Sequence, residues 1–232
     1  MNRVRSLLHW AGLSVRRCRA CGEAAADGGR LCPSCAEMLQ PDAAPRCRLC
    51  GVSLPAEAGG LCAVCAAAPP PWEALYFHGR YEGLLRELIL EYKFGRNLGL
   101  GRLLMELAAG AAPAGGAWDM LVPAPLHASR LRWRGFNQSR ELCRLLAKRT
   151  GAPIVDRALS RIRTAAPQSV LDKKQRLANV AGAFRADAAL AAGRSVLLAD
   201  DVMTTGATLS ECARTLLAAG AACVEVLVLA RD

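Results

Sequence analysis

Long apolar runs are missing from this 232-residue chain, although just over half of its residues are hydrophobic. No run reaches the roughly 18 residues that a membrane-spanning helix needs, so the sequence predicts no membrane span. A convincing export leader is also missing. In the opening MNRVRSLLHWAGLSVRRC, His9 interrupts the short apolar run, and Arg16-Arg17 stands where a cleavage site needs small residues. We interpret residues 1–15 as a short amphipathic segment and expect a cytoplasmic protein.

Acidic residues are scarce between Arg130 and Arg176, where thirteen Arg and Lys accompany three Asp and Glu. The rest of the chain is balanced, with seventeen of each, so the whole net charge of +10 comes from this segment. A local basic surface is typical of proteins that bind a polyanion, either a nucleic acid or a polyphosphorylated small molecule. A solvated surface that is merely rich in arginine would spread the charge more evenly.

A dinucleotide-binding fingerprint is absent as well. The Gly-Leu-Gly at 99–101 follows no expected strand, and no third glycine completes it. Three single cysteines, Cys143, Cys212 and Cys223, lie in apolar helix or strand patterns, which favours packing in the core over nucleophilic chemistry.

Paired cysteines, by contrast, are abundant. Eight of the eleven cysteines form four C-x2-C pairs, and the pairs repeat with a period of about thirty residues. Two such pairs supply the four thiolates of a tetrahedral zinc site, which leaves no position open for catalysis. Gly22 and Gly51 let the backbone turn back and direct amides at the sulfurs. We therefore expect two structural zinc ions, bound by Cys18, Cys21, Cys32 and Cys35 and by Cys47, Cys50, Cys62 and Cys65.

Two alternatives exist for these cysteines. Disulfides need an oxidising compartment, which the missing export leader disfavours, and four thiolates also bind iron–sulfur clusters. Pairing within each repeat is favoured because each repeat carries a complete ligand set, but the spacing leaves open a metal shared by the two middle pairs. Since residues 16–68 hold little apolar material, we expect zinc to supply much of the folding free energy of this double zinc ribbon.

A second domain follows the prolines at 69–71. We place a Pro-rich linker at 69–80 and the second domain at 81–232. The apolar spacing in this domain predicts helices over 83–94, 98–110 and 136–149 and from Ala207 to Gly220, with strands at 118–125, 153–155, 196–200 and 223–230. Such alternation is typical of an α/β fold, a mostly parallel sheet with helices on both faces. Ligands of these sheets bind beyond the carboxyl ends of the strands, where the loops at 123–136 and 200–208 should meet part of 160–180.

The segment VLLADDVMTTGATL, at 196–209, carries the most specific signal. Asp200 and Asp201 follow the apolar run, and we expect their side chains to point to opposite sides. Thr204 to Thr208 then open a helix, where backbone amides, the helix dipole and hydroxyl groups favour an anion. A strand end with an ordinary threonine cap explains either half alone. The two halves in this order predict a phosphate site beside two carboxylates, which suit ribose hydroxyls or a metal bound by the ligand.

This segment resembles the phosphoribosyl-pyrophosphate (PRPP) signature of type I phosphoribosyltransferases. The resemblance implies that Asp200 and Asp201 are the catalytic pair that holds the ribose 2′- and 3′-hydroxyls. It implies that the 5′-phosphate is bound by Thr204, Thr205, Gly206, Ala207 and Thr208.

Over nearly the whole chain, the order of motifs is similar to that of the ComF (competence protein F) family. The double ribbon, YEGLLRELILEYKF, VPAPLHASRLRWRGFNQSRELC and DDVMTTGAT follow one another as in that family, and RGFNQ and DDVMTTGAT are the most specific parts. The resemblance implies a type I phosphoribosyltransferase fold after an N-terminal double zinc ribbon. It also implies a pyrophosphate loop with Pro125, Leu126, His127, Arg130 and Arg134, and a mobile loop with Arg161, Arg163, Gln168 and Arg176.

The same resemblance implies that the ligand is PRPP with Mg²⁺, or another phosphoribosyl or nucleotide-like molecule. It also implies a role in natural transformation or in the use of external DNA. Arg130, Arg132 and Arg134 are candidates for binding the leaving pyrophosphate. The sequence identifies no acceptor site, so we favour a transferase with an unknown acceptor. The alternative is a non-catalytic adaptor that binds single-stranded DNA and a helicase or processing protein of the DNA-uptake machinery. For His127, a simple loop contact is favoured over a catalytic role.

Overall fold

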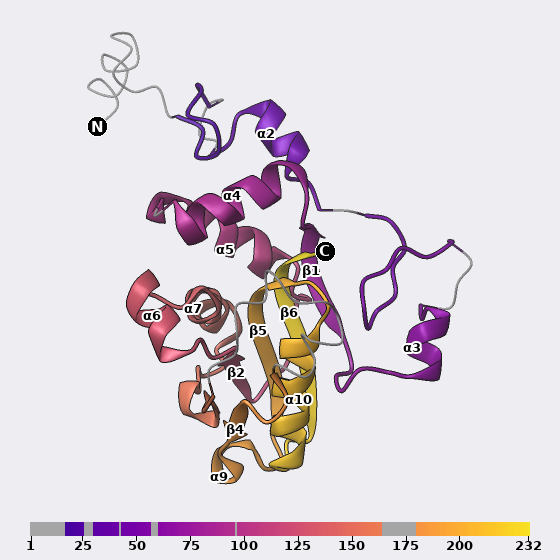
Figure 1. Cartoon of the computed structure of the whole chain (residues 1–232). Helices are drawn as coiled ribbons and strands as arrows, with labels where there is room; N and C mark the ends of the chain where they lie inside the picture. Colours follow the sequence, from indigo (N-terminus) through magenta and orange to yellow (C-terminus); the bar gives the residue numbers. More distant parts are fainter. Residues whose placement is uncertain (1–16, 26–29, 42, 57–59, 96, 164–179) are drawn as a thin grey trace.

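A four-stranded parallel sheet forms the centre of the molecule (Figure 1). The computed structural model describes residues 17–25, 30–41, 43–56, 60–95, 97–163 and 180–232. The strand order is β1-β6-β5-β2, and each neighbouring pair is parallel. The strands are β1 (Leu75–Arg80), β2 (Met120–Pro123), β5 (Ser195–Met203) and β6 (Cys223–Arg231).

Helices cover both faces of this sheet because its strands are apolar on both sides. Along β5, Val196 and Leu198 belong to the core cluster that includes α10 (Ala207–Ala218). Leu197 and Ala199 belong to the opposite cluster, which includes α4 (Gly83–Phe94), α5 (Gly101–Gly110) and α7 (Gln138–Thr150). The predicted fold, a parallel sheet with helices on both faces, is confirmed.

Two elements differ from the sequence-based expectation. The segment 69–80, expected as a linker, contains β1, which forms the edge of the sheet through pairs such as Leu75 with Val226. The adjacent prolines hid this strand. In addition, β5 continues past both acids to Met203, because β6 is long enough to pair with it there through Arg231. The two acids therefore lie inside the last part of the strand and not after it.

Smaller elements complete the α/β domain. A turn of 3-10 helix, η1 (Leu98–Leu100), leads into α5, and Ile154 bridges to Leu121 of β2 at the short strand expected there. The helix α6 (Ala128–Arg134) precedes α7, and η2 (Asp156–Ala158) follows it. A two-stranded antiparallel sheet of β3 (Leu159–Arg161) and β4 (Phe184–Ala186) comes next, with α9 (Ala188–Ala191) leading into β5.

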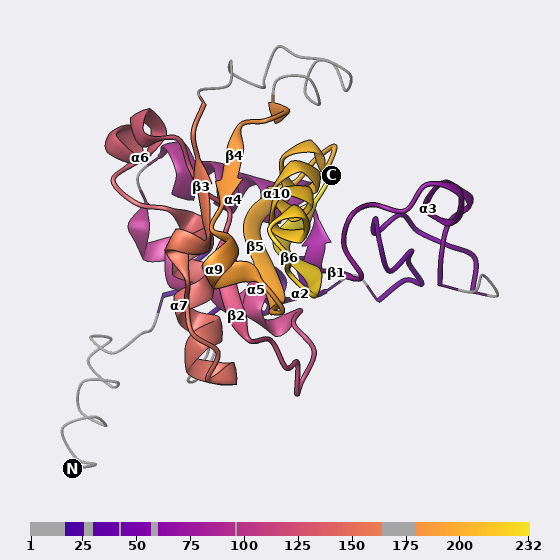
Figure 2. The ribbon, with the colours of Figure 1, turned by 90° about the horizontal axis from the view of Figure 1, so that it is seen from below.

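The two cysteine ribbons contact different parts of this domain. The first carries α2 (Pro33–Met38), and Nε2 of the buried His78 lies 2.8 Å from the carbonyl oxygen of Leu39, just after α2. The second carries α3 (Ala63–Ala67) and stands beside β1, where the Leu75 amide donates to the Arg48 carbonyl at 2.8 Å (Figure 2). None of the helices in the described parts of the chain has the length and apolarity that crossing a membrane requires.

Candidate functional site

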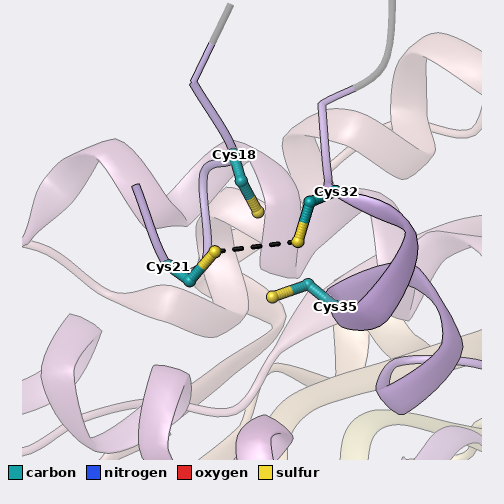
Figure 3. Close-up of side chains that lie close together, drawn as sticks. All are labelled: Cys18, Cys21, Cys32 and Cys35. Atoms are coloured by element: carbon teal, nitrogen blue, oxygen red, sulfur yellow. Dashed lines mark hydrogen bonds between the residues drawn. The ribbon is translucent and has the colours of Figure 1, made fainter. Parts of the chain in front are cut away.

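Two cysteine tetrads form, one within each sequence repeat. Cys18, Cys21, Cys32 and Cys35 point toward a common centre (Figure 3), and in each tetrad the four sulfur atoms lie within 4.8 Å of one another. The sulfurs of Cys21 and Cys32 are 3.7 Å apart, as are those of Cys50 and Cys62. Tetrahedral thiolates at about 2.3 Å from zinc would be separated by about 3.8 Å. All eleven cysteines are free thiols, so the tetrads support the expected structural zinc and not disulfides.

The backbone of each ribbon also favours metal binding. Gly22 and Gly51 adopt φ of 81° and 73°, and their amides donate to the carbonyls of Cys18 and Cys47 at 2.9 and 2.8 Å. Burial opposes ionisation of these two thiols, but hydrogen bonds from nearby backbone amides outweigh it and lower the pKa of each to about 6. The thiolate form is thus favoured at the first cysteine of each ribbon, whereas the pKa of Cys35 and of Cys65 is raised, chiefly by burial.

A cavity of about 370 Å³ lies at the carboxyl edge of the sheet. Its lining contains most of the residues predicted from sequence: Asp200, Asp201, Thr204, Thr205, Gly206, Ala207, Thr208, Pro125, Leu126, Arg130, Arg134 and Arg161. Arg161 is held there against the ring of Phe184, 5.4 Å from the ring centre. Arg163 and His127 are not among the lining residues, and Gln168 and Arg176 lie outside the described residues.

The two acids of this cavity have different partners. Ser139 at the start of α7 donates its hydroxyl to Asp200 at 2.9 Å, and the Asp201 amide donates to the same oxygen at 2.8 Å. Asp201 instead forms an ion pair with Lys93 of α4, at 2.9 Å between Nζ and Oδ2. Burial, together with the neighbouring charge of Asp201, raises the pKa of Asp200 to about 7. Asp200 therefore changes its ionisation near neutral pH.

The threonine loop joins β5 to α10 as the sequence predicted. Gly206 has φ of 74°, a left-handed conformation that suits glycine, and α10 begins at the next residue. The Ala207 amide has only a long contact, 3.4 Å, with the Thr205 hydroxyl. The amino end of a twelve-residue helix thus faces the cavity with the geometry that favours a phosphate group.

The RGFNQ motif fixes the opposite wall. Asn137 caps α7 by accepting from the Ser139 amide at 3.0 Å, and its side-chain amide donates to the Ala124 carbonyl at 3.1 Å. Gly135 ends α6 in a left-handed conformation, with φ of 85°. Arg134 lies with its guanidinium 5.5 Å from the ring centre of Phe94, and burial lowers its pKa. The motif therefore holds the predicted pyrophosphate loop and directs a cation into the cavity.

His127 has a local structural contact. It is the N-cap of α6, where its Nδ1 accepts from the Ser129 amide at 3.2 Å. The side chain is part of an exposed turn beside the cavity lining. His127 therefore stabilises the turn that begins α6, and the loop contact favoured from the sequence stays a prediction.

Sequence reasoning missed several residues of the site. Lys93, Phe94 and Tyr81 line the cavity, and Ser139 binds Asp200. Two signals were present: Lys93 is one of only four lysines in the chain, and Ser139 directly follows RGFNQ. Neither signal says which acid the residue would reach, because that depends on how the helices pack on the sheet.

The second ribbon packs against the threonine loop. Arg231, paired with Met203 at the end of β5, donates through Nε to the Cys50 carbonyl at 2.8 Å. Trp72 donates to the Leu49 carbonyl at 2.8 Å, and its ring lies beside Gly206. Cys47 and Cys65 share a core cluster with these elements, so the second zinc site supports the wall that would hold a phosphate.

Comparison with known proteins agrees with this architecture. A family model described as a double zinc ribbon domain matches residues 13–73, and one described as a phosphoribosyl transferase domain matches residues 145–232. The molecule is thus a double zinc ribbon joined to a phosphoribosyltransferase domain. The solved glutamine PRPP amidotransferase from B. subtilis aligns with 59% of this chain and 30% of its own, with 19% identity and a TM-score of 0.41.

Curated relatives match along almost the full length. DNA utilization protein YhgH of Salmonella typhimurium is 35% identical over 232 residues, which cover 97% of this chain and 92% of the relative. Competence protein F of Haemophilus influenzae is 30% identical over 213 residues, or 87% of this chain and 90% of the relative. The chain belongs to the ComF (competence protein F) family.

Proposed function

We propose that the protein binds PRPP together with Mg²⁺ in the cavity at the carboxyl edge of the sheet. One observation carries this proposal: Asp200 and Asp201 lie beside the amino end of α10, and arginine side chains line the same cavity. Carboxylates accept hydrogen bonds from ribose hydroxyls, and helix amides bind a phosphate. A ligand with both groups on one five-carbon sugar satisfies both parts of the site.

Cations in the cavity suit the pyrophosphate group of this ligand. Arg130, Arg134 and Arg161 line the cavity together with Lys93. Fixed cations in a partly enclosed cavity stabilise the charge that develops on a departing pyrophosphate. Mg²⁺ would add further positive charge to the ligand when bound, and the neighbouring carboxylates are suitable oxygen ligands for it.

We further propose a transfer of the phosphoribosyltransferase type. The bond between C1 of the ribose and the pyrophosphate oxygen breaks, and pyrophosphate leaves with the electron pair. A nitrogen nucleophile of the acceptor then bonds to C1 and loses its proton. Because two relatives are named for DNA utilization and competence, we propose that the reaction serves the cytoplasmic use of external DNA.

Isothermal titration with PRPP and Mg²⁺ tests the binding proposal. Saturable heat at millimolar ligand or below is expected for the wild-type protein, and it should be lost in the Asp200→Ala/Asp201→Ala double variant. Arg194→Gln is a suitable control, because Arg194 is exposed and precedes β5 at the opposite edge of the sheet. Absence of heat in the wild type, or unchanged binding in the double variant, would refute the proposal.

A second candidate function is a non-catalytic adaptor that binds single-stranded DNA and a helicase or processing protein. The excess of Arg and Lys in 130–176 favours it, and Arg130 and Arg132 lie exposed on α6. Binding through phosphates should weaken steeply as salt increases. An affinity for single-stranded DNA that does not change with salt would count against this candidate.

A further inference from the structure

Two large aromatic side chains lie exposed at the mouth of the cavity. Phe94, the last residue of α4, and Trp133 of α6 are each 57% exposed, and their ring centres are 6.1 Å apart. Phe94 lines the cavity, whereas Trp133 lines an adjoining hollow of about 300 Å³. Large aromatic side chains usually bury most of their surface, so an exposed pair beside a ligand site indicates a contact surface.

This aromatic pair stands at the start of a longer groove. The cavity and the hollow share Lys93 and Arg134 as walls. The hollow in turn shares Tyr92, Leu98 and Phe136 with a larger depression of about 760 Å³ between α5 and α7. Figure 1 shows the two helix pairs that border it, with α4 and α5 on one side and α6 and α7 on the other.

Cations outnumber acids in the lining of the groove, although Lys93 pairs with Asp201 and Arg102 pairs with Glu106. Arg132 lines the hollow, and Arg102, Arg144 and Lys148 line the larger depression. Glu141 is the acid among the lining residues, and it pairs with Arg144. Aromatic rings that alternate with cations suit a chain of phosphates that carries unpaired bases.

We propose that this groove binds single-stranded nucleic acid, with an unpaired base stacked on the Phe94–Trp133 pair. The phosphates then follow Arg132 and Lys148 toward α7. The inference rests on the second function proposed above and gives it a location. It also places a base next to the phosphoribosyl cavity, because Phe94 belongs to both surfaces. A duplex does not fit this mode, since its base faces are already stacked on their neighbours.

Fluorescence anisotropy with an oligothymidylate of about 15 nucleotides tests the stacking surface. Trp133→Ala should lower the affinity by at least about fivefold, because stacking on one aromatic ring typically contributes that much or more per base. Trp133→Phe should retain most of the affinity. Arg132→Gln and Lys148→Gln should each reduce the slope of log affinity against log salt by about 0.7, whereas Arg194→Gln should not.

The controls separate the possible failures. Trp133→Ala should keep two zinc ions and normal PRPP binding, which shows that the variant is folded. Two results would show that the stacking proposal is wrong while DNA binding itself stands. In the first, Trp133→Ala binds the oligonucleotide as well as the wild type does. In the second, the wild type binds a duplex of the same length as tightly as the oligonucleotide. If the wild type does not bind the oligonucleotide, the stacking proposal and the DNA-binding function are both wrong. The PRPP titration still tests the first proposed function independently.

Discussion

Asp200 and Asp201 are adjacent in the chain but have different electrostatic surroundings. Lys93 compensates Asp201 directly, whereas Asp200 accepts from a hydroxyl and a backbone amide. Burial and the adjacent negative charge of Asp201 raise the pKa of Asp200 to about 7, although the two neutral donors act to lower it. At neutral pH Asp200 is therefore partly protonated, and the two carboxyl groups together carry less than two negative charges. Hydrogen-bond donors of a bound ligand would favour the fully ionised pair.

This raised pKa predicts that PRPP affinity depends on pH. Ribose hydroxyls donate to an ionised carboxylate, so binding should release a proton and tighten about tenfold per pH unit well below pH 7, levelling off above it. Isothermal titration in buffers of different ionisation enthalpy measures the released proton. Asp200→Asn should bind more weakly and without this dependence. An affinity that is flat across this pH range in the wild type would contradict the assignment.

The same raised pKa predicts how the free energy of unfolding changes with pH. Between the ordinary range of aspartate and about pH 7, folded Asp200 binds more protons than the unfolded chain does. The contribution of this residue to the free energy of unfolding therefore falls as pH rises through that interval. In chemical denaturation, the free energy of unfolding of Asp200→Asn should therefore increase relative to that of the wild type as pH rises. A decrease relative to the wild type would contradict the raised pKa.

Gly206 offers a test of the phosphate loop at the residue scale. Its φ is 74°, and Gly193, remote from the cavity, has a similar φ of 70° with open space around it. Alanine at either position should cost about 1–2 kcal/mol of stability, because each imposes the same left-handed strain. PRPP affinity should fall in Gly206→Ala alone. Equal losses of affinity in both variants would indicate a general effect of strain.

At the scale of elements, the two ribbons have different relations to the site. The first contacts α4 through the cluster around Cys18, Cys32 and Cys35, which includes Leu84. The second bonds to Arg231 and Trp72 and packs against the loop after β5. The repeats are similar in sequence, but only the second lies directly behind the predicted phosphate site.

This difference predicts unequal effects of matched zinc-ligand variants. Cys21→Ser and Cys50→Ser occupy corresponding positions, and each should reduce the zinc content from two ions to one. PRPP affinity should fall more in Cys50→Ser, because Arg231 and Trp72 then lose a rigid partner. Zinc analysis and PRPP titration of the same preparations measure both effects. Equal affinities in the two variants would contradict the supporting role of the second ribbon.

The extent to which elements could be predicted follows from their patterns. Helix α4 and strand β6 carry strong apolar patterns, and the sequence predicted both within about one residue. Strand β1 was missed because its contacts with β6 and with the two ribbons join residues that are distant in sequence. The extension of β5 past Asp200 was missed because polar residues at a strand end are stabilised by pairing that sequence does not display.

At the scale of the whole molecule, we expect the folding of the two ribbons to depend on zinc. We expect two zinc ions per chain by metal analysis, and their removal by a chelator should unfold residues 17–68 first, because these residues bury little apolar material. Iron in place of zinc, or a single ion, would contradict the two tetrads. Hydrogen exchange of the sheet before and after chelation measures how far the effect extends.

The candidate site shows the same division between local and distant information. Asp200, Asp201 and the threonine loop could be predicted because they are adjacent in sequence and one strand and one helix direct them. Lys93 and Ser139 could not, because α4 and α7 bring them there only after packing on the sheet. The aromatic pair Phe94 and Trp133 joins two helices in the same way.

A crystal structure of the protein with PRPP and Mg²⁺ tests the central claim most directly. The account predicts the 5′-phosphate at the amides that follow Thr204, the ribose hydroxyls at Asp200 and Asp201, and the pyrophosphate toward Arg130 and Arg134. An empty cavity at saturating PRPP, or a ligand bound with its 5′-phosphate away from the threonine loop, would contradict it.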